Sequence, residues 1–276
     1  DKSQALRFRP SLDPKLWAWS WKFLRQCTAE RSRANTLVKL RLCLLSIEEM
    51  RRIREAEGFG YDETLKGAVY LYRDQGHLET GLANAQLLKD NGVTGLRAVD
   101  REELVRIEPA LAAVKERLAG ALYSEQDESG DCRLFSERLA ERVVARGGRF
   151  LHGRSVTGLK SERGRVVAAT TNRGDVEADA FVLSLGSYAP AVAKTAGVRL
   201  PIYPVKGYSL TLPVGPEHTA PTLPGVDENY LVAFARLGDR LRLTATADFA
   251  GYDTNHTPAH FQTMLKVARE LFPDGA

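Results

Sequence analysis

The chain has 276 residues, of which 43% are hydrophobic and 27% charged, and its formal net charge is +4. These values are typical of a folded globular protein with one large domain or two closely packed ones, and they exclude a disordered chain. Lys and Arg are spread along the sequence, which indicates a basic surface and no nucleic-acid partner. Residues 22–54 are denser in basic side chains. A solvated helix face explains them, and contact with an anionic membrane is the alternative.

The cysteines and histidines indicate no disulfide framework and no metal site. Cys27, Cys43 and Cys132 lie far apart and form no C-x-x-C pair, so we expect a reducing, cytoplasmic-type compartment. His256 and His260 flank a proline at a predicted helix start and do not share a helical face. No apolar run is long enough to span a bilayer, and no signal peptide is visible.

Helix start and stop signals organise the first half of the chain. Asp13-Pro14, Asp100-x-x-Glu103 and Asp131 are N-cap patterns, and glycines or prolines follow each helical pattern. The two ends, Asp1 without a methionine and Ala276 directly after a helical pattern, suggest a piece of a longer protein. In order, the patterns predict a helix to residue 24, a long amphipathic helix ending at 58, a strand at 68–72, a helix at 78–91, a short helix ending at 109, a strand at 118–123 and a helix from 131 to 147.

A series of short strands leads to the most informative stretch of the sequence. Strands are predicted at 150–152, 155–160, 166–171 and 176–178, with turns that make the middle pieces a β-meander. Residues 181–185 follow as a buried strand, broken by Gly186 before a helix that begins near Ala189. Such a strand end lets backbone N–H groups approach a ligand, as in doubly wound sheets, although an ordinary core strand is the alternative.

The last quarter of the chain has a different pattern. Alternating strands are predicted at 202–212, 230–235 and 241–247, and Thr257-Pro258 begins a final helix. We expect an antiparallel sheet with one helix on it, as a second domain that starts near Pro201. The predicted fold class is α/β (α+β overall), with part of a doubly wound sheet that carries an inserted meander, and an antiparallel or mixed second sheet.

Candidate ligand-binding side chains gather in this last sheet. Period-two alternation places Lys206 and Tyr208 on one strand face, where a cation and a phenol would suit an anionic small molecule. Solvent-facing residues of an edge strand explain them equally well. The same sheet offers weaker candidates: Tyr230, Arg236, Arg242 and Tyr252. The chain has no G-x-G-x-x-G, P-loop, H-E-x-x-H or G-x-S-x-G motif.

Five stretches together resemble the bacterial D-amino acid dehydrogenases, within the D-amino acid oxidase-like group of FAD-dependent oxidoreductases. They occur in the family's order, with similar spacing, across most of the chain. The stretches are W-K-F-L-R-Q-C (21–27), R-I-E-P-A-L-A (106–112), E-S-G-D-C-R-L-F (128–135), D-A-F-V-L-S-L-G-S-Y (179–188) and Y-P-V-K-G-Y-S-L-T-L-P (203–213).

The resemblance implies a two-domain flavoprotein that holds FAD. Residues 1–125 would supply helical and substrate-domain elements, 126–200 part of the FAD-binding domain, and 201–276 the substrate-domain sheet and helix. Lys206 and Tyr208 would begin the substrate sheet under the flavin, while no catalytic residue is assigned within the chain. The residues that would lie near the cofactor are Val156, at its adenine end, and Ser184, Leu185, Gly186 and Tyr188 at the closing strand.

The resemblance also implies an activity for the complete protein. D-Amino acids such as D-alanine would be oxidatively deaminated to 2-oxo acids and ammonia, with electrons passed to a quinone or respiratory acceptor. The location would be cytoplasmic, and a peripheral contact with the inner membrane stays open. A glycine or sarcosine oxidase-like flavoprotein and a non-catalytic fragment that needs a partner chain are the alternatives.

Three departures from the family pattern qualify this expectation. The family's N-terminal glycine loop, which holds the pyrophosphate, would precede Asp1, so we expect this chain alone to bind FAD poorly. A G-L-R-P-type segment, whose arginine is expected to clamp the substrate carboxylate, would follow the chain. The paired glycines of the family's R-I-R-V-type strand are replaced here in the stretch 243–246.

Overall fold

The computed structural model describes residues 6–8 and 11–275, and the chain divides into two compact units. Unit 1 comprises Asp1–Arg9, Ala29–Arg142 and Lys206–Ala276, and unit 2 comprises Pro10–Thr28 and Val143–Val205. Each unit is therefore assembled from segments that are distant in the sequence.

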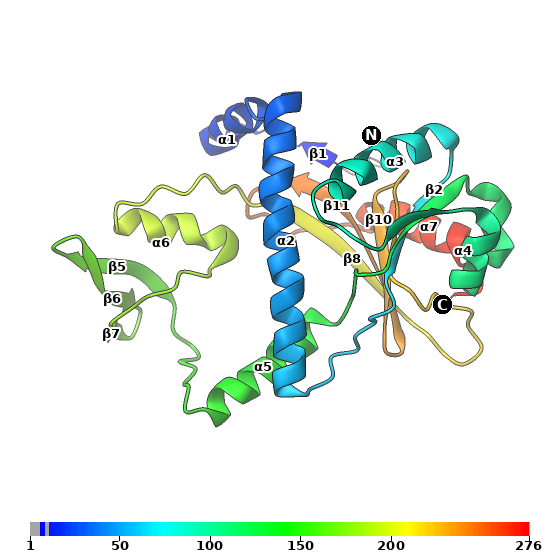
Figure 1. Ribbon diagram of the computed structural model, residues 1–276. Helices are drawn as coiled ribbons and strands as arrows, with labels where there is room; N and C mark the ends of the chain where they lie inside the picture. Colours follow the sequence, from blue (N-terminus) through cyan, green and yellow to red (C-terminus); the bar gives the residue numbers. More distant parts are fainter. Residues whose placement is uncertain (1–5, 9–10, 276) are drawn as a thin grey trace. The chain divides into compact units, whose positions relative to one another are not determined.

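Unit 1 is built on a mixed sheet of eight described strands (Figure 1). Their order is β1-β11-β10-β9-β2-β4-β3, and β8 also pairs with β11. Most pairs are antiparallel, but β2 pairs with β9 and β1 with β11 in parallel, so the sheet is mixed. The strands are β1 (Leu6–Phe8), β2 (Ala68–Tyr72), β3 (Leu96–Val99), β4 (Gly120–Ser124), β8 (Lys206–Pro213), β9 (Gly225–Asp227), β10 (Val232–Leu237) and β11 (Arg240–Phe249).

The helices of unit 1 begin largely where the sequence predicts them. Asp74, Asp100 and Asp131 cap α3, α4 and α5, because each side chain accepts backbone N–H groups of the first turn. Thr257 and His260 form a capping box ahead of the last helix. The helices are α2 (Ala29–Glu57), α3 (Gln75–Lys89), α4 (Arg101–Ile107), η1 (Pro109–Arg117), α5 (Cys132–Ala145), η3 (Pro258–Phe261) and α7 (Gln262–Leu271).

One face of this sheet carries the core of unit 1. Leu241 and Leu243 of β11 are fully buried against Met264, Val267 and Leu271 of α7. Removing a leucine side chain from water stabilises the fold by about 2 kcal/mol, so this cluster holds the tail strands and α7 together. The predicted sheet with one helix on it is confirmed, and β2, β3, β4 and β9 extend it beyond the predicted tail.

The other face of the sheet meets the long helix α2. The helix is amphipathic as predicted, because Leu37, Leu40, Leu44 and Ile47 recur along one face and are all half-buried. Ile47 lines a cavity together with residues of β2, β10 and β11. Helix α2 therefore reaches this side of the sheet at Ile47, across the cavity.

Unit 2 contains a three-stranded antiparallel sheet, β5-β6-β7, and two helices. The predicted meander is confirmed: Arg163 and Gly164 both adopt positive φ, which is the geometry of a two-residue hairpin turn. Helix α6 packs on β5, where the Thr195 hydroxyl accepts the Leu159 amide at 2.8 Å. The elements are α1 (Pro14–Leu24), β5 (Val156–Glu162), β6 (Arg165–Thr171), β7 (Gly174–Glu177), η2 (Gly186–Tyr188) and α6 (Ala189–Thr195).

Two strand predictions in unit 2 are wrong. Residues 150–152 and 181–185 have strand-like sequences but form no strand, and Val182 is 92% exposed. A strand is stabilised by hydrogen bonds to a neighbour, and no described segment pairs with either stretch. The turn that follows residues 181–185 does form, with Gly186 at φ +53°, and α6 begins at Ala189 as predicted.

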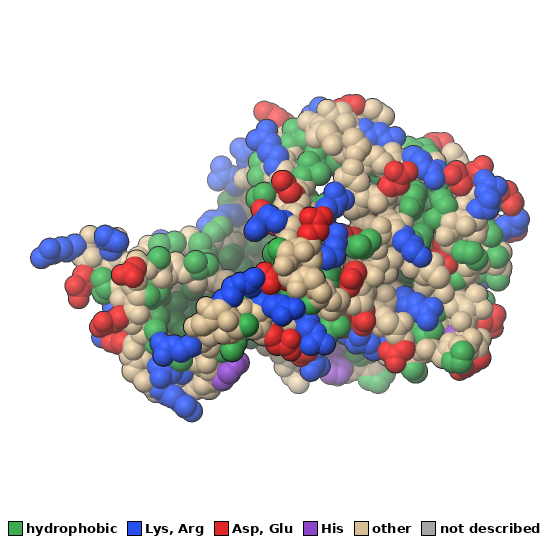
Figure 2. Space-filling model, turned by 60° about the horizontal axis from the view of Figure 1, so that its bottom comes forward, with side chains coloured by type: hydrophobic (Ala, Val, Ile, Leu, Met, Phe, Trp, Pro, Cys, Tyr) green, Lys and Arg blue, Asp and Glu red, His purple; other side chains and the backbone are tan. Residues whose placement is uncertain are grey.

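The surface of the chain carries charges of both signs. On the face shown in Figure 2, basic and acidic side chains are interspersed, and neither sign gathers in one large patch. Within the described residues, no helix is long and apolar enough to cross a membrane.

Candidate functional site

A cavity of about 620 Å³ lies between the sheet of unit 1 and the residues that face it from α2 and the 127–132 segment. Its volume is in the range of small-molecule and cofactor sites. Small residues form much of its floor, including Ala68 of β2, Gly225 of β9, and Ala233 and Ala235 of β10. Because these side chains are short, a planar ring could lie flat on the middle strands.

One end of the cavity is a patch of one cation and three hydroxyl groups. The register pairs Arg242 of β11 with Thr211 of β8, and Thr244 with Ser209, so these four side chains form two adjacent rows on one face. Arg242 Nε donates to Thr211 Oγ1 at 3.2 Å. Arg242, Thr244 and Ser209 line the cavity itself. We refer to these four residues as the oxyanion patch.

The other end of the cavity is acidic. The Tyr70 hydroxyl donates to Asp127 Oδ2 at 2.6 Å, and burial, with the neighbouring carboxylate, raises the pKa of Tyr70. Glu128 accepts from Arg54 at 2.7 Å through one carboxylate oxygen. Its other oxygen, Oε1, and the Ser129 hydroxyl are buried without a hydrogen-bond partner in the described structure. Asp127, Glu128 and Ser129 all line this end of the cavity, which is therefore rich in hydrogen-bond acceptors.

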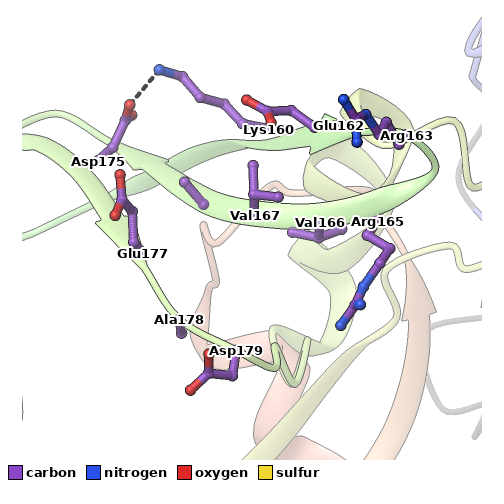
Figure 3. Close-up of a pocket in the computed structure, with 11 residues that line it drawn as sticks. Lys160, Glu162, Arg163, Arg165, Val166, Val167, Asp175, Glu177, Ala178 and Asp179 are labelled. Carbon is purple, nitrogen blue, oxygen red and sulfur yellow. Dashed lines mark hydrogen bonds and ion pairs between the residues drawn. The ribbon is translucent and has the colours of Figure 1, made fainter.

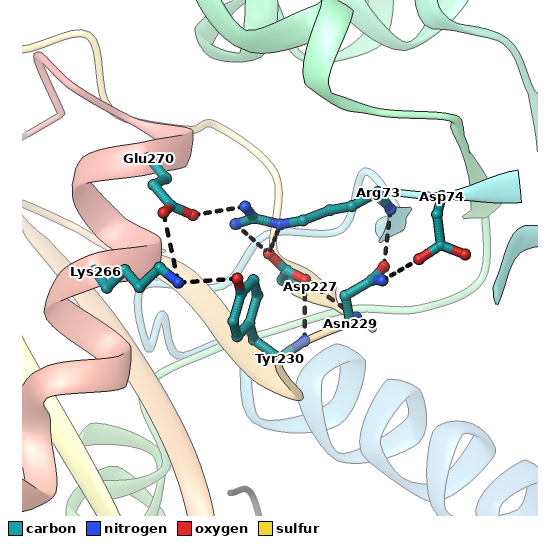
Figure 4. A network of polar contacts seen from close by, with 7 residues as sticks. All are labelled: Arg73, Asp74, Asp227, Asn229, Tyr230, Lys266 and Glu270. Atoms are coloured by element: carbon teal, nitrogen blue, oxygen red, sulfur yellow. Dashed lines mark hydrogen bonds and ion pairs between the residues drawn. The ribbon is translucent and has the colours of Figure 1, made fainter. Parts of the chain in front are cut away.

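A second polar network braces the sheet against α7 (Figure 4). Arg73 donates to the fully buried Asp227 at 2.7 Å and to Glu270 of α7 at 2.6 Å, and its guanidinium lies 4.6 Å from the Tyr230 ring centroid. Lys266 donates to the Tyr230 hydroxyl at 3.0 Å. All these groups have partners within the fold, so the network is structural.

Lys206 and Tyr208, the predicted substrate-binding residues, lie together on the core face of β8. Lys206 Nζ donates to the carbonyl oxygens of Asp253 and Asn255, and lies 5.3 Å from the Tyr208 ring centroid. The Tyr208 hydroxyl donates to the buried Asp248 at 2.8 Å. The next residue, Ser209, points to the cavity because successive side chains alternate between faces.

The predicted cofactor-binding residues all lie in unit 2. Val156 begins β5 and is 38% exposed, while Ser184 and Leu185 belong to the unpaired segment before η2. Gly186 and Tyr188 form η2, and Tyr188 is 64% exposed. A Cβ added at Gly186 would meet no atom, so this turn can be approached closely from outside.

Unit 2 also has a hollow of about 880 Å³ along its small sheet (Figure 3). Lys160 and Asp175 form an ion pair there, and Arg163, Arg165, Glu162, Glu177 and Asp179 surround it. Because acidic and basic groups nearly balance, the hollow lacks the single-sign field that would attract a charged ligand. The cavity of unit 1 is the stronger candidate site.

Sequence reasoning missed most of the residues that line this site. Arg242 was among the weaker candidates, but Tyr70, Asp127 and Glu128 were not. The period-two pattern of 202–212 already separates Ser209 and Thr211 from Lys206 and Tyr208. The pattern does not tell which of the two faces packs against the hydrophobic core and which faces the cavity.

Comparison with known proteins supports one family. Residues 12–276 match the family described as FAD dependent oxidoreductase. The chain is 45% identical over 269 residues to D-amino acid dehydrogenase 2 of Mesorhizobium japonicum, covering 97% of this chain and 64% of that protein. It is 38% identical over 274 residues to D-amino acid dehydrogenase of Rhizobium johnstonii, covering 99% and 66%.

Solved structures show the same fold. A glycine oxidase from Geobacillus kaustophilus aligns with a TM-score of 0.70 at 22% identity, over 86% of this chain and 62% of that one. An L-proline dehydrogenase from P. horikoshii aligns with a TM-score of 0.70 at 17% identity, over 83% and 61%. The chain thus spans about two thirds of the length of the curated relatives named above. The match over residues 12–276 and the 45% identical relative show that the chain belongs to the FAD dependent oxidoreductase family.

Proposed function

We propose that the whole protein is an FAD-dependent D-amino acid dehydrogenase. It oxidises substrates such as D-alanine to 2-oxo acids and ammonia and passes the electrons to a quinone or another respiratory acceptor. Two relatives that carry this name are 45% and 38% identical to nearly the whole chain. The observation that carries the proposal in this chain is the cavity of unit 1, which is lined by the Arg242 cation at one end and by the carboxylates of Asp127 and Glu128 at the other.

The cavity fits part of the surroundings that a flavin and an amino acid need. Its floor includes the small residues Ala68, Gly225, Ala233 and Ala235, and its volume of about 620 Å³ leaves room for a ring system beside a small substrate. FAD, when bound, supplies the acceptor for the hydride that leaves the substrate's Cα. In unit 2, the proposed contacts with the dinucleotide are Val156, Ser184, Leu185, Gly186 and Tyr188.

The residues of this chain bind and orient the substrate. Lys206 and Tyr208 belong to the site as the residues that hold β8 to the core, so that Ser209 faces the cavity. Orientation matters because an amino acid held at one fixed angle reacts far faster than a freely tumbling one. The imino acid left by hydride loss reacts with water to give the 2-oxo acid and ammonia. A peripheral contact with the inner membrane would bring the acceptor within reach.

The first test is spectroscopic and uses both the full-length protein and the present chain. Each is incubated with FAD, desalted, and mixed with D-alanine or sarcosine while the flavin absorption band is recorded. We expect the full-length protein to retain FAD and its band to bleach with D-alanine. Bleaching with sarcosine but not D-alanine would instead indicate the oxidase-like alternative. Retention of stoichiometric FAD by the present chain would show that unit 2 needs no glycine loop.

A further inference from the structure

We propose that helix α1 is the surface by which the whole protein lies on an anionic lipid bilayer. This proposal rests on the proposed function, in which a membrane holds the electron acceptor, and it names the part of the chain that makes the contact. Trp17 and Trp21 of α1 are 63% and 66% exposed, and Leu24, one turn further, is exposed as well. Large apolar rings gain most from leaving water, so two exposed tryptophans indicate a surface that something else covers.

The exposed residues form one stripe along the helix. Trp17, Trp21 and Leu24 are spaced by four and three positions, which places their side chains in a row on the same helical face. We refer to these three residues as the apolar stripe. The helix has 11 residues and is about 16 Å long. It is too short to cross a bilayer, but it suits a helix that lies flat in the bilayer surface.

The side of α1 that carries Leu16 and Trp19 is fixed to unit 2. Leu16 is buried, and the centroid of the Trp19 ring lies 6.2 Å from that of Tyr203. The Tyr203 hydroxyl donates to Asp13, the N-cap of the helix, at 3.2 Å. Because these contacts hold the helix by its Leu16 side, it cannot turn the apolar stripe inward within unit 2.

The charges of α1 match anionic lipid headgroups. From residue 14 to residue 29, the sequence has the basic residues Lys15, Lys22 and Arg25 and no acidic residue. Asp13, just before the helix, accepts from the Lys15 amide and from Tyr203. A lysine or arginine near an anionic membrane strengthens binding about fivefold, whereas lysine is depleted from protein–protein interfaces. Tryptophans accompanied only by cations therefore favour a bilayer over a protein partner.

The indole rings suit the headgroup level of a bilayer, where an apolar ring meets hydrocarbon and its N–H stays near polar groups. Trp17 Nε1 donates to the Ser11 carbonyl oxygen at 2.9 Å, so this ring can leave water without leaving its donor unpaired. Lys15 and Lys22 can extend their charged ends to the headgroups on flexible apolar stems. The helix can therefore enter the bilayer surface in the conformation that it already has.

The test measures binding of the full-length protein to vesicles of phosphatidylglycerol and phosphatidylcholine in equal parts, by co-sedimentation. We expect Trp17→Ser/Trp21→Ser to lower the partition coefficient at least about 10-fold, because two apolar anchors are lost. Lys15→Gln/Lys22→Gln should lower it about 10-fold on these vesicles and should not change the weaker binding to phosphatidylcholine alone.

Two further variants control for fold and for position. Leu42→Ser/Leu45→Ser is the matched control, since it removes two exposed apolar side chains from α2, which carries basic residues of its own, and it should bind like the wild type. Trp17→Phe/Trp21→Phe should keep most of the binding. In the wild type, brominated lipid should quench tryptophan fluorescence on binding, and this quenching should fall in the phenylalanine variant.

The outcomes separate α1 from other surfaces. Absence of vesicle binding in the wild type, or unchanged binding of Trp17→Ser/Trp21→Ser, would overturn the proposal and mean that another part of the whole protein or a protein partner covers the apolar stripe. A loss confined to Leu42→Ser/Leu45→Ser would overturn it in favour of α2. If the wild type oxidises no D-amino acid, the proposed function fails, while the vesicle measurements still test α1.

Discussion

The two units use similar apolar patterns with different results. In unit 1, the buried strands and α7 form one continuous cluster that includes Leu71, Leu243 and Met264. In the described part of unit 2, the buried apolar side chains are few and mostly small: Leu16, Ala168, Ala189, Val192 and Ala193. Large residues such as Trp17, Trp21, Val182 and Tyr188 are exposed there. An apolar strand pattern therefore becomes a core only where other strands and helices close over it.

The largest expected effect comes from emptying the core of unit 1. Leu243→Ala should lower the free energy of unfolding by about 3 kcal/mol, because the leucine is fully buried and its removal leaves a cavity. Val182→Ala in unit 2 should change it by less than about 0.5 kcal/mol, because that side chain is 92% exposed. Urea unfolding of the full-length protein measures both. Equal losses would show that Val182 is buried in the whole protein and would break the comparison.

Overpacking the core side of β9 should have the next largest effect. A Cβ added at Gly225 would lie 2.6 Å from the Val69 carbonyl oxygen and would also press on the Phe234 ring. Gly225→Ala should therefore cost about 2 kcal/mol, since β2 and β10 must move apart. Gly60→Ala is the control, because its Cβ would meet only a glutamate oxygen at 3.9 Å. Similar melting temperatures for the two variants would mean that β9 shifts without cost.

A smaller, opposite effect is expected at the bulge of β11. Thr246 has φ +69° where the register with β8 shifts, and a β-branched residue is strained in that conformation. Thr246→Gly should stabilise the protein by up to about 1 kcal/mol, the relief of strain exceeding the added freedom of the unfolded chain. Thr244→Gly, two residues earlier without positive φ, should destabilise it instead. Thermal unfolding compares the two variants. A loss of stability in both would contradict the proposal that Thr246 is strained.

The smallest effect concerns the cap of α3. Hydrogen bonds from the His77 amide and ring and from Asn229 lower the pKa of Asp74 to about 2. The lowered pKa means that Asp74 stabilises the fold fully above its ordinary pKa near 4, and that this stabilisation is lost as the pH falls toward 2. Asp74→Ala should unfold more readily than the wild type at pH 6, and the difference in urea midpoint should shrink toward pH 2. A difference in urea midpoint that does not change with pH would show that Asp74 acts through packing and not through its charge.

The helix caps, the meander and the family resemblance could all be predicted from the sequence, because each depends on a few neighbouring residues. Asp13, Asp100 and Asp131 cap the helices that their spacing predicts. The absence of a strand at residues 181–185 could not be predicted. A strand forms only beside a neighbouring strand, and that neighbour can lie anywhere in the chain. The short strands β3 and β9 were missed because four and three residues carry little periodic signal.

The sequence by itself determined the α/β class, most helix bounds and the turns of the meander, since backbone preferences and capping act over a few residues. Only the tertiary structure decided that β9 joins β2 in parallel, that Tyr208 faces the core while Ser209 faces the cavity, and that Arg242 lies across the sheet from Asp127 and Glu128. The pairing of β9 with β2 and the placing of Arg242 opposite Asp127 relate residues more than a hundred positions apart, and the facing of Tyr208 and Ser209 depends on which sheet face α7 covers.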